Sequence, residues 1–150
     1  MNAEILDRVV AVVNDEIILF SEVEEAFQEA SDAALEVTRE EVLDGLINRI
    51  LLLNQAKNIK GKHVYSDAIK REDNILINEY IEKRLKAFIR IPYNELELFY
   101  QENKEFFTED FLEVRDEIEA YLIEIELNKK LSEHLEELRE EAYIRVQLEG

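Results

Sequence analysis

Only one proline and three glycines occur in this chain of 150 residues, so few positions can interrupt a helix. This scarcity argues against collagen-like, loop-rich and glycine-rich phosphate-loop architectures, and it favours long helices. Hydrophobic residues make up 47% of the chain, which is enough to bury a core. We therefore expect a mainly α protein that forms one domain over residues 1–150.

Strand signals occur at the two ends of the chain. Residues 8–13 are mostly β-branched and apolar, and a second apolar run at 16–20 follows the turn-prone pair Asn14 and Asp15. Near the other end, alternate residues are apolar: Ala142, Ile144, Val146 and Leu148. An isolated hairpin is marginally stable in water. We therefore expect the N-terminal hairpin and the C-terminal strand to form one small antiparallel sheet.

Two helix starts match the capping-box pattern, in which a hydroxyl and a glutamate three residues later satisfy free backbone N–H groups. These pairs are Ser21 with Glu24 and Thr38 with Glu41. The helix after Thr38 carries a wide apolar stripe and should be the most buried. The stripe consists of Val42, Leu43, Leu46, Ile47, Ile50, Leu51 and Leu53.

Further helices are expected along the second half of the chain. A third helix should begin near Ser66 and end before Pro92, which opens a short helix of its own. Thr108 can cap a last helix of some thirty residues, which at ~1.5 Å per residue is roughly 45–50 Å long. A helix of this length usually needs a partner surface. We thus divide the chain into 1–107, a hairpin with helices, and 108–150, a long helix and a strand that returns to the N-terminal lobe.

Acidic residues outnumber basic ones 36 to 18, and the resulting charge of −18 argues against nucleic-acid binding. The charge is unevenly distributed, because residues 57–90 carry a net +4 while both flanking regions are acidic. This basic segment either packs between the acidic regions or attracts acidic clients. The longest apolar runs fall far short of the roughly 20 residues that a membrane helix needs, so we expect no stable membrane insertion.

Residues with catalytic or metal-binding chemistry are scarce. Cysteine is absent, which excludes disulfides, thiolate metal sites and a cysteine nucleophile. The two histidines, His63 and His134, have no partner at metal-ligand spacing, and His134 is expected on the surface of the last helix. We therefore expect no enzymatic activity, no metal and no cofactor.

Four segments together resemble the SurA family of periplasmic chaperones. They are residues 6–23 (LDRVVAVVNDEIILFSEV), 42–52 (VLDGLINRILL), 91–104 (IPYNELELFYQENK) and 138–146 (LREEAYIRV). In that family the first segment forms a hairpin that leads into the first helix. One departure is clear: family members usually carry parvulin-type prolyl isomerase domains before the C-terminal helix, whereas here Phe107 is followed directly by that helix. The chain thus resembles the chaperone core without its isomerase.

The resemblance implies an ATP-independent chaperone that binds unfolded outer-membrane or secreted polypeptides in an apolar crevice between helices. It also implies a periplasmic location, with a signal peptide removed. The alternative is a helical dimerisation or assembly scaffold of the cell envelope. Both functions are compatible with a homodimer formed by exchange of a strand or a helix.

Thirteen aromatic residues are more than a small helical core strictly needs. Several of them, at positions 99, 100, 106 and 107, are so close in sequence that they cannot all face one core. Most should be buried, and a few should line an apolar groove, where flexible clients find amphipathic contacts. As peptide-binding candidates we select Phe88, Tyr93, Phe106 and Tyr121.

Overall fold

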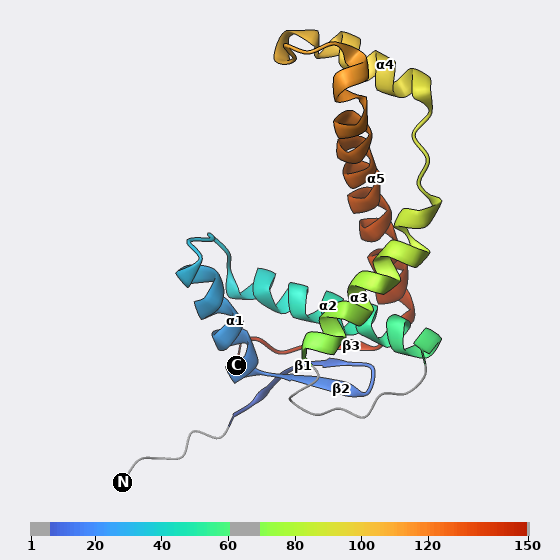
Figure 1. Ribbon diagram of the computed structural model, residues 1–150. Coiled ribbons are helices and arrows are strands. Elements are labelled where there is room, and N and C mark those ends of the chain that lie inside the picture. The colour runs from blue at the N-terminus through green and yellow to red at the C-terminus, as the bar shows by residue number, and fades with distance from the viewer. Residues whose placement is uncertain (1–6, 61–69, 150) are drawn as a thin grey trace. The chain divides into compact units, whose positions relative to one another are not determined.

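The computed structural model describes residues 7–60 and 70–149 and is mainly α with one small antiparallel sheet, as the sequence predicts. Figure 1 shows the elements in chain order. The strands are β1 (Val9–Val13), β2 (Glu16–Leu19) and β3 (Ile144–Val146). The helices are α1 (Phe20–Asp32), α2 (Arg39–Lys60), α3 (Lys70–Arg84), α4 (Tyr93–Glu102) and α5 (Phe111–Glu141), with short 3-10 helices η2 (Lys86–Phe88) and η3 (Lys104–Phe106).

The chain divides into two compact units. The first unit contains the residues up to Ile77 and those from Leu135 onward, and the second contains Asn78–His134. The boundaries between the units therefore fall inside α3 and α5. The first unit holds the sheet with α1 and α2, and the second holds α4 with most of α5.

The sheet joins the two ends of the chain, with strand order β2-β1-β3. Both neighbours of β1 run antiparallel to it, and Ala11 lies opposite Ile18 on one side and Val146 on the other. Asn14 adopts φ 55°, a left-handed conformation that asparagine tolerates and that a tight hairpin turn requires. The predicted meeting of hairpin and C-terminal strand is thus confirmed.

Backbone hydrogen bonds anchor the C-terminal strand at both of its ends. The amide of Asn14 donates to the carbonyl of Tyr143 (2.7 Å), and the amide of Gln147 donates to that of Val10 (2.7 Å). The guanidinium of Arg8 also donates to the carbonyls of Gln147 (3.1 Å) and Leu148 (2.7 Å). The alternation seen in the sequence gives only a partly buried face, because Ala142, Ile144 and Leu148 are half-buried while Val146 is 50% exposed. Pairing of the backbone, rather than burial of side chains, is the main contribution of β3.

The core of the first unit lies between the sheet and the first two helices. Its fully buried side chains from β1, β2 and α1 are Val10, Val13, Ile18 and Val23. Helix α2 adds six buried residues, more than any other helix among the described residues: Leu43, Ile47, Leu51, Leu52, Leu53 and Ala56. This burial confirms the prediction from its apolar stripe.

One of the two predicted capping boxes is correct. The amide of Glu41 donates to Thr38 Oγ1 (3.1 Å), and the amide of Thr38 donates to Glu41 Oε1 (3.2 Å). The Ser21 box is wrong, because α1 begins at Phe20 and places Ser21 inside the helix. There the hydroxyl of Ser21 bonds to Asp7, and this hydrogen bond lowers the pKa of the Asp7 carboxyl.

Glu22 has the capping role that the sequence pattern predicts for Glu24. Its carboxylate accepts a hydrogen bond from the backbone amide of Leu19 (3.1 Å). Glu24 instead forms an ion pair with Arg39 of α2. The glutamate of the cap therefore lies two residues earlier than the pattern predicts, and the hydroxyl of Ser21 bonds to Asp7.

The second half of the chain also differs in its helix boundaries. Helix α5 begins at Phe111, so Thr108 does not cap it. The third helix ends at Arg84, before Pro92 as expected, and η2 and an extended segment lie between the two. Its expected start near Ser66 lies outside the described residues.

Arg139 links the end of α5 to α2 within the first unit. Its guanidinium donates to Asn48 Oδ1 (2.8 and 3.1 Å) and to Asp44 Oδ1 (2.5 Å). We expect Arg139→Met to lower the free energy of unfolding by about 1.5–3 kcal/mol, the range for hydrogen bonds to charged groups. The matched control is Arg115→Met, whose exposed pairing with Asp116 should contribute at most about 1 kcal/mol. Urea unfolding measures both, and equal losses would contradict the linking role of Arg139.

Glu16 of β2 has a carboxyl group whose pKa is shifted by partial burial. Desolvation raises the pKa of the Glu16 carboxyl, while the charge of Lys57 on α2 opposes this shift. Because the pKa is raised in the native state, ionisation of Glu16 lowers the free energy of unfolding. We therefore expect Glu16→Gln to gain stability over the wild type as the pH rises above about 4.5, where unfolded glutamate ionises.

Glu24 provides a control, because its pKa is shifted in the opposite direction. Its hydrogen bond from Arg39 lowers the pKa of its carboxyl, so the stability contributed by Glu24 is lost as the pH falls through that lowered value. Glu24→Gln should thus lose stability relative to wild type as the pH rises towards neutrality. Unfolding free energies from pH 3 to about pH 7 test both variants. The same trend for Glu16→Gln as for Glu24→Gln would contradict the burial of Glu16.

Candidate functional site

Helix α4 and the first half of α5 form the core of the second unit. Pro92 precedes α4 and supplies a fixed φ of −60°, which suits the start of a helix. The buried core residues come at helical spacing from both elements: Leu96, Tyr100, Val114 and Ile118. The hydroxyl of Tyr100 is satisfied by the carbonyl of Glu109 (2.7 Å), which fixes the connection between the two helices.

Six aromatic rings of this unit form one continuous row. Tyr93 meets Phe111 (5.6 Å between ring centroids), and Phe111 meets Tyr100 at the same distance. Tyr100 then contacts Phe107 (5.3 Å), which contacts Phe99 (6.5 Å). Phe99 finally meets Tyr121 (5.6 Å). Two of the five contacts, Tyr93–Phe111 and Phe99–Phe107, are edge-to-face, an arrangement that aromatic quadrupoles favour, and the other three are tilted.

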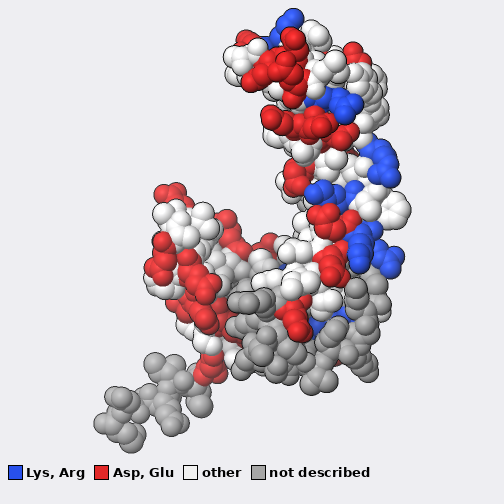
Figure 2. Space-filling view, in the orientation of Figure 1, with Lys and Arg blue, Asp and Glu red and all other residues white. Residues whose placement is uncertain are grey.

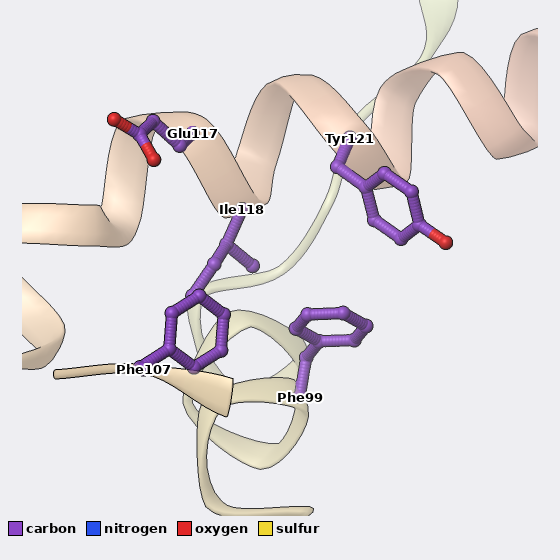
Figure 3. Close-up of a pocket in the computed structure, with 5 residues that line it drawn as sticks. All are labelled: Phe99, Phe107, Glu117, Ile118 and Tyr121. Carbon is purple, nitrogen blue, oxygen red and sulfur yellow. The ribbon is translucent and has the colours of Figure 1, made fainter. Parts of the chain in front are cut away.

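A groove lies at the Tyr121 end of this row. It has a volume of about 270 Å³ and is lined by Phe99, Phe107, Glu117, Ile118 and Tyr121. Figure 3 shows Ile118 and Tyr121 directed from α5 towards the rings of Phe99 and Phe107, while the carboxylate of Glu117 points away from these rings. The groove therefore offers apolar walls with a carboxylate at its rim.

The structure places all four predicted peptide-binding residues on the surface. The exposed fraction is 73% for Phe88, 47% for Tyr93, 76% for Phe106 and 55% for Tyr121. Tyr93 and Tyr121 are the two ends of the aromatic row, and Tyr121 lines the groove. Phe88 on η2 and Phe106 on η3 make no ring contact with the other described residues, and neither of them lines the groove.

Phe99 and Phe107 are groove residues that the sequence prediction missed. The sequence indicated only that the rings at positions 99, 100, 106 and 107 cannot all face one core, and these two were not among the four selected candidates. Each is half-buried, and each presents part of its ring to the groove. Their closeness to Tyr100 in sequence was the available signal, since one core cannot cover so many rings.

The surroundings of the groove are strongly acidic. Residues 91–126, which include α4 and the first half of α5, contain twelve acidic and two basic residues. Acidic side chains predominate on the visible face of α4 and the first half of α5 (Figure 2). Any molecule that enters the groove therefore approaches through a negative potential.

Tyr80 and His134 form a polar pair elsewhere in this unit. The Tyr80 hydroxyl lies 2.6 Å from His134 Nε2, and the two rings stack with centroids 5.7 Å apart. Burial raises the pKa of the Tyr80 hydroxyl. The expectation that His134 is an ordinary surface residue is therefore wrong, because α3 supplies a partner that the sequence of α5 could not indicate. This polar pair links helices α3 and α5, and neither of its residues lines the aromatic groove.

Other chemical sites are not evident in residues 7–60 and 70–149. Within these ranges no three side chains of His, Asp or Glu come together as metal ligands. No described helix is both long and apolar enough to cross a membrane. The aromatic groove is thus the feature of the described chain that is best suited to bind another molecule.

Comparisons with known proteins add no assignment to this picture. No family model matches the chain, and no curated protein matches it.

Proposed function

We propose that this protein is an ATP-independent chaperone of the bacterial periplasm. It binds apolar segments of unfolded outer-membrane or secreted polypeptides and keeps them from aggregating. The observation that carries the proposal is the row of six aromatic rings, which ends in an open groove beside the exposed Tyr121.

The geometry of the groove suits transient binding of varied segments. A volume of about 270 Å³ accommodates one or two large side chains. Aromatic walls give apolar contact to many side-chain shapes, and each buried large side chain contributes about 1.5–3 kcal/mol. A few such contacts give weak, reversible binding, as a chaperone requires in order to release its client.

The sequence resemblance to the SurA family supports the same proposal. The segments that carry it include both chain ends, and in the structure these ends lie together in one sheet. The acidic surface adds a second argument, because a net charge of −18 should help to keep a client-loaded complex soluble. The periplasmic location rests on the resemblance.

Suppression of aggregation tests the proposal. An unfolded outer-membrane protein is diluted from urea, and light scattering is followed with and without the chain. We expect the wild type to suppress scattering and Tyr121→Ser to suppress it severalfold less. Tyr143→Ser is the matched control, since Tyr143 is 54% exposed but belongs to the first unit. No suppression by the wild type would refute the chaperone function.

A helical assembly scaffold that forms homodimers is the second candidate. The exposed apolar residues of α5 favour it, because Leu112, Tyr121 and Ile125 lie open along this long helix. Exchange of a strand or helix would then join two copies. Sedimentation velocity separates the candidates: a dimer that shows no suppression of aggregation favours the scaffold, and a monomer that suppresses it excludes the scaffold.

A further inference from the structure

We propose that the aromatic groove selects apolar segments that carry basic residues and discriminates against acidic ones. This inference rests on the proposed chaperone function and adds a client class to it. Its basis is the combination of apolar groove walls with a carboxylate at the rim and an acidic unit around them.

The rim of the groove places a charge where a client side chain can reach it. Glu117 lines the groove, but its carboxylate is directed away from Phe99 and Phe107 (Figure 3). A carboxylate in this position leaves the apolar walls free for an aromatic or aliphatic side chain. A lysine or arginine next to that side chain has a long flexible stem, which can follow the wall and bring its charge to Glu117.

The surroundings reinforce the same preference. The segment 91–126 that builds the groove has a net charge of −10, with Lys104 and Arg115 as its two basic residues. Arg115 pairs with Asp116 at 3.1 Å, and Glu124 pairs with Lys86 of η2 at 3.5 Å. Arg115 is already counted in the net charge of −10, and Lys86 compensates only one further charge, so the potential at the groove is negative.

Apolar burial and charge then act on different properties of the client. Burial of a client side chain provides affinity without regard to charge. The negative potential raises the local concentration of basic segments and lowers that of acidic ones. Since selectivity is a difference between two binding free energies, repulsion of acidic segments contributes as much as attraction of basic ones.

Three labelled peptides test the inference. Each has the same two aromatic residues in an uncharged frame, and they differ in carrying three lysines, three glutamines or three glutamates. Fluorescence anisotropy is measured with the full chain at low and high salt. We expect the lysine peptide to bind about tenfold more tightly than the glutamate peptide at 20 mM salt. The ratio of these two affinities should fall to about twofold at 500 mM salt, where the Debye length is only a few ångströms.

Variants assign the effect to the groove. Glu117→Lys should reduce the preference for the lysine peptide about threefold, since it replaces an attractive charge by a repulsive one near the bound segment. Glu119→Lys is the matched control: it changes the net charge equally on the same helix, but residue 119 does not line the groove. Tyr121→Ser should weaken the binding of all three peptides by the same factor.

The outcomes separate this inference from the proposed function. If all three peptides bind equally at 20 mM salt, or if Glu119→Lys acts as strongly as Glu117→Lys, selection by the groove is refuted and the chaperone proposal stands. If none of the peptides binds, the proposed function itself is refuted.

Discussion

Removal of residues 142–150 should lower the free energy of unfolding of the first unit by about 3–5 kcal/mol. The truncation removes β3 and with it the backbone hydrogen bonds that reach β1, including those at Asn14 and Val10. It also removes both carbonyls that accept from Arg8. Strand β1 would become an edge strand with free backbone groups, so aggregation should increase as well.

The measurement is hydrogen exchange of the β1 amides together with a thermal melt. A loss of this size corresponds to a fall of roughly 10 °C or more in Tm. Removal of residues 149 and 150 alone is the control, because it leaves the bonds to the carbonyls of Gln147 and Leu148 in place. An unchanged Tm after the longer truncation would mean that the C-terminal strand does not support the sheet.

Replacement of Tyr100 by alanine should have an effect of similar size on the second unit. Tyr100 is buried in the centre of the aromatic row and contacts both Phe107 and Phe111. Truncation of a buried aromatic residue to alanine costs about 3–5 kcal/mol. Because Phe107 also lines the groove, we expect Tyr100→Ala to lose peptide binding as well as stability.

Tyr100→Phe separates packing from hydrogen bonding in this prediction. It keeps the ring and removes only the hydrogen bond to the Glu109 carbonyl, which should cost about 0.5–1.5 kcal/mol. Peptide binding should therefore persist in Tyr100→Phe. Urea unfolding followed by near-ultraviolet circular dichroism measures both variants. Equal losses for the two would contradict the role of the ring in the aromatic row.

The sheet could be predicted from the sequence because its signals are local and strong. The β-branched run of β1 and the turn at Asn14 and Asp15 define a hairpin, and the need for a third strand points to the C-terminal segment. The capping of α1 could not be predicted in the same way. Ser21 has the right spacing to Glu24, yet its hydroxyl bonds to Asp7, a residue brought near only by the fold.

The candidate site could be predicted only in part, for a related reason. Periodicity identifies the apolar face of a helix but does not say which rings on that face are completely covered. Tyr121 was selected as one of four candidates because thirteen aromatic residues are more than the core needs. Phe99 and Phe107 were missed because their partial exposure depends on where α5 crosses them, which no local pattern contains.

Cross-linking at the groove tests the central claim most directly. A photoreactive phenylalanine analogue replaces Tyr121 in one variant and Tyr143 in another, two tyrosines with nearly equal exposure, 55% and 54%. Each variant is illuminated with an unfolded outer-membrane protein and with the same protein in its folded form. We expect strong cross-links from position 121 to the unfolded client, few from position 143, and few from either position to the folded form. Equal cross-linking from the two positions would contradict client binding in the aromatic groove.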